Sequence, residues 1–181
     1  MSRLLGLAAL AVALVAACGI PAAPAPSPTA DRFGAPLVAA PRDVRQKSDP
    51  CLALTAADLA DIGMTANGRP KTLQTGDRAC DWRSADGARY LTIIVIADRD
   101  VLVDTYRTRQ FAVFTPIQVA GLPATSEQSY PDSTTCTVTV GTAIGQGFVS
   151  DSTASDPRSA CEQAERAGQL LVAALPPLPG E

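Results

Sequence analysis

Hydrophobic and polar positions along this chain of 181 residues alternate in patterns that predict several β-strands. The segment 90–97 is apolar on both faces, so we expect a central strand there. At 79–83 the alternation places Cys80 and Trp82 on one face of a second strand. Turn signals rich in glycine, or containing Pro-Asp, separate four further expected strands, around 116–120, 124–130, 134–140 and 143–149.

Two short helices are predicted by their capping residues. Thr55 with Asp58 three positions later has the spacing of a capping box, and Gly63 has the residue type that ends a helix. Asp98 or Asp100 is placed to cap a second helix over about 101–111.

A long C-terminal helix is the most strongly indicated element. Asp156 is its expected N-cap, Pro157 occupies the first helical position, and Pro176 and Pro177 stop the helix after about 175. Alanine, glycine, leucine and valine form an apolar stripe along it, and we expect Glu162 and Arg166 to pair on the opposite side. Together these elements predict an α+β fold, a mostly antiparallel sheet with helices packed on it. A β-sandwich with peripheral helices is the alternative.

The first 17 residues are typical of a secretory signal peptide. Arg3 precedes an uncharged run of leucine, alanine and valine that is shorter than the roughly 20 apolar residues of a membrane-spanning helix. The run ends at Val15-Ala16-Ala17-Cys18, small residues directly before a cysteine, which resembles the lipobox of bacterial lipoproteins. That resemblance implies cleavage before Cys18 and lipidation of its thiol. Two acyl chains hold a protein stably at a membrane, whereas one chain binds only marginally.

Proline and alanine dominate the segment after Cys18. Such a sequence buries too little apolar surface to fold, so we expect 18–48 to be a disordered tether. A single domain is then expected over 49–176 and a disordered tail over 177–181.

Four cysteines remain once Cys18 is set apart, an even number that predicts two disulfides in an exported protein. Three connectivities are possible. Pairing each helix-associated cysteine with the nearest strand cysteine favours Cys51–Cys80 and Cys136–Cys161. Pairing Cys51 with Cys161 and Cys80 with Cys136 stays open. A zinc site is disfavoured, because the chain has no Cys-x-x-Cys and no histidine.

The order of the cysteine motifs resembles one family. Asp49-Pro50-Cys51 before the first helix, Cys80-x-Trp82, Cys136-x-Val138 and Cys161-x-x-Ala164 are similar to the actinobacterial lipoproteins grouped as "domain of unknown function 3558". The resemblance spans about 48–175 together with the lipobox and the tether. It implies a lipid-anchored domain outside the cytoplasm and transfers no catalytic residues.

Composition excludes several kinds of chemistry. Without histidine the chain has no Ser-His-Asp or Cys-His catalysis, and paired cysteines leave no thiol nucleophile. We therefore expect no catalytic residue, no metal site and no cofactor. A net charge of −3 argues against nucleic acid as a partner.

The remaining candidates each have a structural explanation that we favour. The acidic group Asp98, Asp100 and Asp104 has the composition of a calcium or acid–base site, but helix capping explains it better. Trp82 is expected in the core rather than in a ligand pocket. We interpret Gly141, Gly145 and Gly147 as turn and bulge glycines rather than a phosphate loop. The serines near Glu127 lack a general base (Ser126, Ser129 and Ser133).

The predicted function is a non-catalytic binding or interaction domain, lipid-anchored on the outer face of the plasma membrane. Its expected partner is an envelope protein, a cell-wall component or a small apolar ligand. The alternative is an accessory or sensory subunit of an envelope transporter or enzyme complex. A carboxylate-based hydrolase is the third hypothesis, and two carboxylates facing each other across a cleft would favour it.

Overall fold

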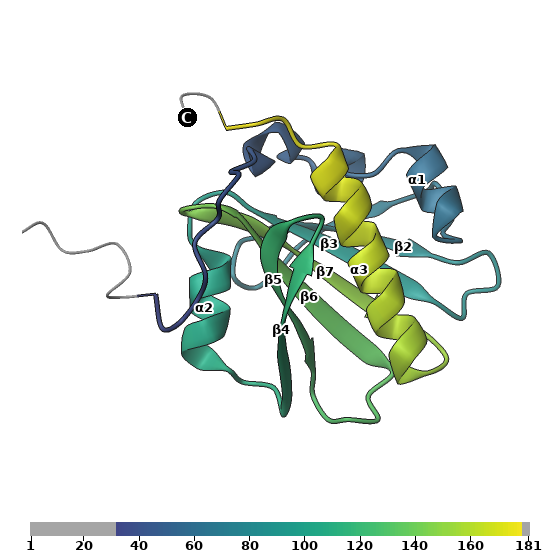
Figure 1. Ribbon diagram of the computed structural model, residues 1–181. Coiled ribbons are helices and arrows are strands. Elements are labelled where there is room, and N and C mark those ends of the chain that lie inside the picture. The colour runs from purple at the N-terminus through teal and green to yellow at the C-terminus, as the bar shows by residue number, and fades with distance from the viewer. Residues whose placement is uncertain (1–31, 179–181) are drawn as a thin grey trace, which may run out of the picture.

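Seven antiparallel strands form one sheet in the computed structural model, which describes residues 32–178 (Figure 1). Their order across the sheet is β1-β2-β3-β7-β6-β5-β4. The strands are β1 (Arg69–Thr72), β2 (Arg78–Arg83), β3 (Tyr90–Ile96), β4 (Val113–Val119), β5 (Leu122–Gln128), β6 (Thr135–Ala143) and β7 (Gln146–Thr153). The α+β expectation is confirmed, and the β-sandwich alternative is wrong for the described residues because they form a single sheet.

Within the described residues, three α-helices and two short 3-10 helices accompany the sheet. They are α1 (Ala56–Asp61), α2 (Val101–Thr108), α3 (Pro157–Ala173), η1 (Val44–Lys47) and η2 (Pro50–Leu52). The predicted caps are confirmed: Thr55 and Asp58 form a reciprocal capping box, Asp100 caps α2, and Asp156 caps α3 ahead of Pro157.

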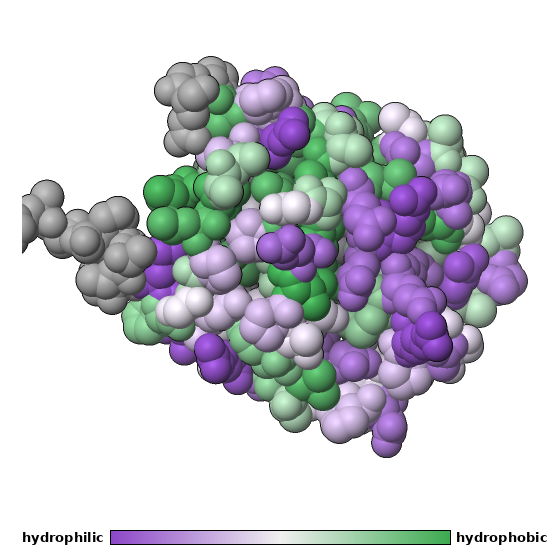
Figure 2. Space-filling model, viewed as in Figure 1, coloured by the Kyte–Doolittle hydropathy of each residue, from purple (hydrophilic) through white to green (hydrophobic). Residues whose placement is uncertain are grey.

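The α3 side of the sheet carries the main hydrophobic core. Alternate residues of the central strands project toward α3, among them Leu91, Val138 and Phe148, all fully buried. They pack in one cluster with the apolar stripe of α3, which includes Ala167 and Leu171. The outward side of α3 is polar, and Figure 2 shows hydrophilic residues gathered over it.

Helix α2 packs on the opposite side of the sheet, where two glycines let it approach. A Cβ atom at Gly141 would lie 2.9 Å from Leu102 Cδ2, and one at Gly147 would lie 2.7 Å from Val101 Cγ1. The turn and bulge expectation also holds, since Gly145 has φ +76° in the β6–β7 turn and the register shifts between Gly141 and Ala143.

Both favoured disulfides are present, so the alternative connectivity is wrong. Cys51 is bonded to Cys80 and Cys136 to Cys161. The first attaches η2 to β2, and the second attaches α3 to β6. Each joins a helical segment to the sheet, as the spacing predicted.

Local details differ from expectation at three places. The helix expected over 101–111 ends at Thr108, because Arg109 adopts a left-handed conformation with φ +39°. Glu162 pairs with Arg158 rather than with Arg166, whose guanidinium reaches Asp61, the last residue of α1, at 2.8 Å. Strand β1 was not predicted, because all four of its residues are exposed and none shows an apolar alternation.

The ordered domain extends beyond both expected boundaries. Val44 is fully buried in the main core, and Arg42 forms a β-bridge with Pro177. The amide of Leu178 donates to the carbonyl of Pro41 at 3.1 Å. The expectation of disorder is therefore wrong for 32–48 and for 177–178, since these two segments hold each other against the domain. The expected signal peptide, Cys18 and the first part of the tether lie outside the described residues, as do 179–181.

Within 32–178, no helix has the length and apolar character that crossing a membrane requires.

Candidate binding groove

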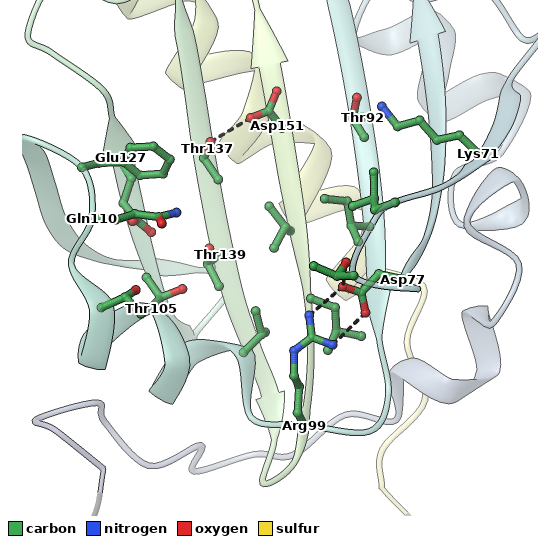
Figure 3. Close-up of a pocket in the computed structure, with 18 residues that line it drawn as sticks. Lys71, Asp77, Thr92, Arg99, Thr105, Gln110, Glu127, Thr137, Thr139 and Asp151 are labelled. Atoms are coloured by element: carbon green, nitrogen blue, oxygen red, sulfur yellow. Dashed lines mark hydrogen bonds and ion pairs between the residues drawn. The ribbon is translucent and has the colours of Figure 1, made fainter.

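A groove of about 370 Å³ lies on the side of the sheet that faces away from α3 (Figure 3). Its floor is the β3, β5, β6 and β7 surface, one wall is α2 with the segment after it, and the other is the β1–β2 segment. The lining residues are Lys71, Leu73, Thr75, Asp77, Thr92, Ile94, Ile96, Arg99, Val101, Thr105, Thr108, Gln110, Phe111, Glu127, Thr137, Thr139, Val149 and Asp151. This volume falls within the range of small-molecule sites, about 300–1,000 Å³.

The polar part of the floor is a row of side chains in register across four strands. Glu127 of β5 is the partner of Thr137 on β6, which is the partner of Asp151 on β7, which in turn pairs with Thr92 on β3. Residues directly opposite each other in neighbouring strands point to the same face of a sheet. Figure 3 shows Thr137 between Glu127 and Asp151. Glu127 and Asp151 therefore lie on the same face of the sheet, separated by one intervening strand, β6.

Glu127 is a buried carboxyl group, with only 3% of the residue exposed. The Thr125 hydroxyl donates to its Oε1 at 2.7 Å. Burial raises the pKa of Glu127, and the hydroxyls of Thr125 and Thr139 offset part of that rise. The cost of desolvating the charge thus exceeds what its hydrogen bonds recover.

Asp151 is half-buried and accepts a hydrogen bond of 2.8 Å from the Thr137 hydroxyl. Burial raises the pKa of Asp151, and Asp81 adds to the rise, while the Thr137 hydroxyl and the charge of Lys71 lower it. The two acids of the floor therefore share one property, a raised pKa caused mainly by loss of water.

The cations of the groove are already paired. Arg99 donates from both terminal nitrogens to the two carboxylate oxygens of Asp77, each at 2.7 Å. The Arg99 guanidinium lowers the pKa of Asp77, more than offsetting burial. Lys71 Nζ lies 2.7 Å from Asp81 Oδ1. Neither Glu127 nor Asp151 forms an ion pair with another described residue, although the charge of Lys71 lowers the pKa of Asp151.

Apolar side chains complete the groove beside these acids. Ile94, Ile96 and Val149 belong to its floor, while Val101 and Phe111 come from the α2 side. Twelve of the 18 lining residues are polar or charged, so polar groups border this apolar surface along its length. Apolar surface combined with placed polar groups is the usual composition of a small-molecule site.

The acidic residues singled out by sequence do not converge. Asp98 and Asp104 each lie 3.6 Å from Arg99, and Asp100 binds Arg32 at 2.8 Å besides capping α2. Nowhere in 32–178 do three or more histidine, cysteine, aspartate or glutamate residues gather as metal ligands would. Capping and ion pairing thus account for this group.

Of the other sequence candidates, Trp82 and Ser126 lie on the core side of the sheet, and Ser133 lies in the turn between β5 and β6. Trp82 is 1% exposed and packs in the main core with Cys80, as expected. Ser126 Oγ lies 3.4 Å from the sulfur of Cys136, and the Ser133 hydroxyl donates to the carbonyl of Thr135. Ser126 and Glu127 are neighbours in the chain but face opposite sides of β5.

Sequence reasoning missed the groove. Its signal was present as the alternation Thr125-x-Glu127, Thr137-x-Thr139 and Val149-x-Asp151. Such alternation is also typical of an ordinary solvent-facing strand surface. Only the pairing of β5, β6 and β7, which no local pattern encodes, shows that these residues share one row.

The chain matches the family model described as "Protein of unknown function (DUF3558)" over residues 13–174, and it therefore belongs to that family. Neither the curated proteins nor the solved structures include a significant match.

Proposed function

Since the family carries no assigned activity, we propose a function from the groove: this chain is an exported lipoprotein that binds a small ligand without converting it. The proposal places the domain on the outer face of the plasma membrane, held by a lipid on Cys18. The observation that carries it is the groove of about 370 Å³, which combines apolar floor residues with the buried Glu127 and the half-buried Asp151.

Two features support the location. The first 18 residues have the charge, length and small-residue ending of a lipoprotein signal. The described domain contains two disulfides, which form and persist mainly in oxidising compartments outside the cytoplasm.

The division of the sheet into two sides supports binding. The α3 side is filled by the main core, whereas α2 covers only part of the other side. A fold whose stability required the second side would fill it with apolar residues. This chain instead places Glu127, Thr137 and Asp151 there in register.

The binding proposal is tested by filling the groove. Val149→Trp adds an indole at the half-exposed centre of the floor, and Ile144→Trp adds the same group on the β6–β7 turn, where Ile144 is 71% exposed. Small molecules that co-purify with the full-length chain are identified by mass spectrometry. We expect one species with the wild type and with Ile144→Trp, and its loss with Val149→Trp. Equal recovery from all three chains would contradict a binding role for the groove.

The anchor is tested by Cys18→Ser, with Ser27→Ala as the control in the same N-terminal region. We expect Cys18→Ser to lose the lipid mass and to leave the membrane fraction, while Ser27→Ala keeps both. A Cys18→Ser chain that remains in the membrane with a normally processed signal would contradict lipid anchoring.

A carboxylate-based hydrolase is the second candidate, favoured by the presence of Glu127 and Asp151 in one groove. Their Cα atoms are two inter-strand spacings apart, about 9–10 Å, whereas the requirement of an inverting glycosidase, about 6.5–9.5 Å, applies to the carboxyl groups themselves. Against it, Glu127 is nearly inaccessible and Phe111 is the one aromatic residue of the groove lining. Release of reducing sugar from cell-wall glycan that Glu127→Gln abolishes would favour the enzyme over the binding module.

An accessory role for the same anchored domain, within an envelope transporter or enzyme complex, concerns its partner rather than its ligand. Cross-linking in cells followed by mass spectrometry distinguishes the accessory role from ligand binding alone. A single recurrent membrane partner would favour the accessory role, and none would favour ligand binding alone.

A further inference from the structure

The N-terminal segment enters the domain at the end of the sheet that carries the β6–β7 turn. Arg32, the first described residue, binds Asp100 at 2.8 Å, and Asp100 caps α2. The N-terminus of α2 packs in turn on the first residues of β7. The segment then reaches the turn itself, where the amide of Arg42 donates to the carbonyl of Thr142 at 2.8 Å. We call this part of the molecule, formed by 32–42 and the β6–β7 turn, the β6–β7 end.

The β6–β7 end exposes an uncharged, largely apolar surface. Residues 33–41 include no charged side chain. Phe33 is 54% exposed and Leu37 is 48% exposed. Ile144, in the turn, is 71% exposed, the largest fraction for any large hydrophobic residue that the structure describes. Figure 2 shows hydrophobic residues gathered at this end, beside the start of the described chain. An exposed apolar surface of this kind marks a contact with another protein or with a membrane.

The opposite end of the sheet differs in composition. Strand pairing places the β2–β3 and β5–β6 turns together there, and β6 spans nine residues, so the two ends lie roughly 30 Å apart. The two turns include Asp86 and Asp132, both exposed. Their exposed large hydrophobic residues are tyrosines, Tyr90 and Tyr130, each of which carries a hydroxyl group. Exposed phenylalanine, leucine and isoleucine side chains therefore distinguish the β6–β7 end from the opposite end.

We propose that the β6–β7 end lies on the lipid bilayer, with the side chains of Phe33, Leu37 and Ile144 inserted at the boundary between headgroups and acyl chains. This inference rests on the lipid anchor proposed above and adds the orientation of the domain that the anchor holds. The groove is then held beside the bilayer, while the β2–β3 and β5–β6 turns face away from it.

The place where the chain enters the domain identifies the bilayer as the occupant of this surface. The 14 residues from 18 to 31 reach at most about 50 Å when fully extended. With the β6–β7 end on the bilayer, Arg32 lies close to the anchor. With the opposite end on the bilayer, Arg32 would lie roughly 30 Å above it, and the tether would be stretched over most of its reach. A stretched chain loses conformational freedom, which disfavours that orientation.

A small apolar surface suffices because the contact is intramolecular. A short connection gives the tethered partner an effective concentration in the millimolar range, so a weak contact is populated without any new binding energy. Each aliphatic or aromatic side chain that leaves water strengthens the contact by about tenfold or more. Three such side chains can therefore orient a domain that the lipid on Cys18 already holds at the membrane.

Brominated lipids test the orientation, because bromine on an acyl chain quenches tryptophan only near contact. The full-length lipidated chain is placed in phosphatidylcholine nanodiscs with and without brominated acyl chains. Ile144→Trp reports on the β6–β7 end, and Tyr130→Trp is the matched control in an exposed turn at the opposite end. The native Trp82 is 1% exposed in the core and provides the background emission. We expect bromine to remove most of the emission added by Ile144→Trp and none of that added by Tyr130→Trp.

A second pair of variants tests whether the exposed residues act as one surface. Leu37→Trp is the reporter, combined either with Ile144→Asp or with Tyr130→Asp. A carboxylate at 144 should lift that end off the bilayer and restore most of the Leu37→Trp emission, because a charge in the apolar phase is unfavourable. The same charge at 130 should leave the Leu37→Trp emission quenched. Both sites are exposed turn positions, so neither substitution disturbs the core.

The outcomes distinguish this orientation from the anchor itself, since the intact mass of each chain first shows whether the lipid is present. If the lipid is present and bromine quenches Ile144→Trp no more than Tyr130→Trp, the orientation is wrong and the anchor stands. Quenching of Leu37→Trp that Ile144→Asp leaves unchanged would also overturn the common surface. If the wild-type chain carries no lipid, the anchor and the orientation fail together.

Discussion

The two sides of the sheet are built from the same strands yet serve opposite purposes. On the α3 side, Phe148 and Ser150 of β7 are fully buried, and the cluster around Phe148 includes Val138 and Leu171. On the other side, Val149 and Asp151 of that strand are half-exposed in the groove. Since neighbouring residues of a strand point to opposite faces, β7 alternates residue by residue between core and groove.

This difference shows how a domain of modest size can provide a ligand site on a sheet. The α3 side concentrates stability, because the main core lies there and the Cys136–Cys161 bond fastens α3 to β6. The groove side is thereby free to hold Glu127, whose burial is unfavourable in itself. Binding sites commonly tolerate such unfavourable groups at the expense of stability.

The largest expected effect is the difference in stability between alanine variants of two adjacent residues, Phe148 on the core side and Val149 on the groove side. Phe148→Ala should lower the free energy of unfolding by about 3–5 kcal/mol, because it leaves a cavity in a fully buried site. Val149→Ala should cost about 1 kcal/mol or less, since the half-exposed side chain loses little burial. Urea denaturation measures both. Similar losses for the two variants would contradict the assignment of stability to the α3 side.

A medium effect is expected where the N-terminal segment meets the groove wall. Asp100 caps α2 and binds Arg32, whose side chain is 9% exposed. Asp100→Ala should cost about 1–3 kcal/mol, through the lost cap and the charge left without its partner. It should also speed hydrogen exchange of the α2 amides.

Asp98→Ala is the control for that variant. Its carboxylate is 82% exposed and lies 3.6 Å from Arg99, so its removal should cost no more than about 1 kcal/mol. If Asp98→Ala destabilises the domain as much as Asp100→Ala does, the Arg32 contact contributes nothing to holding α2.

Local sequence signals predicted most of the fold, because each carries its own physical cause. The Thr55–Asp58 capping box and the Asp156-Pro157 start satisfy backbone donors within one turn, and both are found as predicted. The two disulfides were predicted by pairing each helix-associated cysteine with the nearest strand cysteine, and both are present.

What the sequence did not predict depends on contacts between distant segments. Strand β1 is held by its pairing with β2 and has no apolar face to mark it. Residues 32–48 resemble a tether in composition, yet Val44 enters the core and Pro41 binds Leu178. The groove combines residues from β3, β5, β6 and β7, and it becomes visible only once their register is known.

The smallest and most specific effect concerns the pH dependence of stability on the groove side. Burial raises the pKa of Glu127, so the folded domain holds that proton more tightly than the unfolded chain does. Its contribution to stability is therefore full at low pH and is lost as the pH rises from about 4.5 through the raised pKa. Carboxylates with a lowered pKa act in the opposite sense: the contribution of Asp77 is present above about pH 4 and is lost as the pH falls below it.

Glu127→Gln isolates the contribution of Glu127 ionisation to the free energy of unfolding, because glutamine keeps the shape of the protonated acid and cannot ionise. We expect the variant and the wild type to have similar stability at pH 4.5, where the comparison controls for packing. The variant should become the more stable of the two toward pH 8, as the wild type must ionise a buried group. Urea denaturation at intervals across this range provides the measurement. A stability difference that stays constant with pH would mean that Glu127 titrates alike in the folded and unfolded chains, and burial would then not be what raises its pKa.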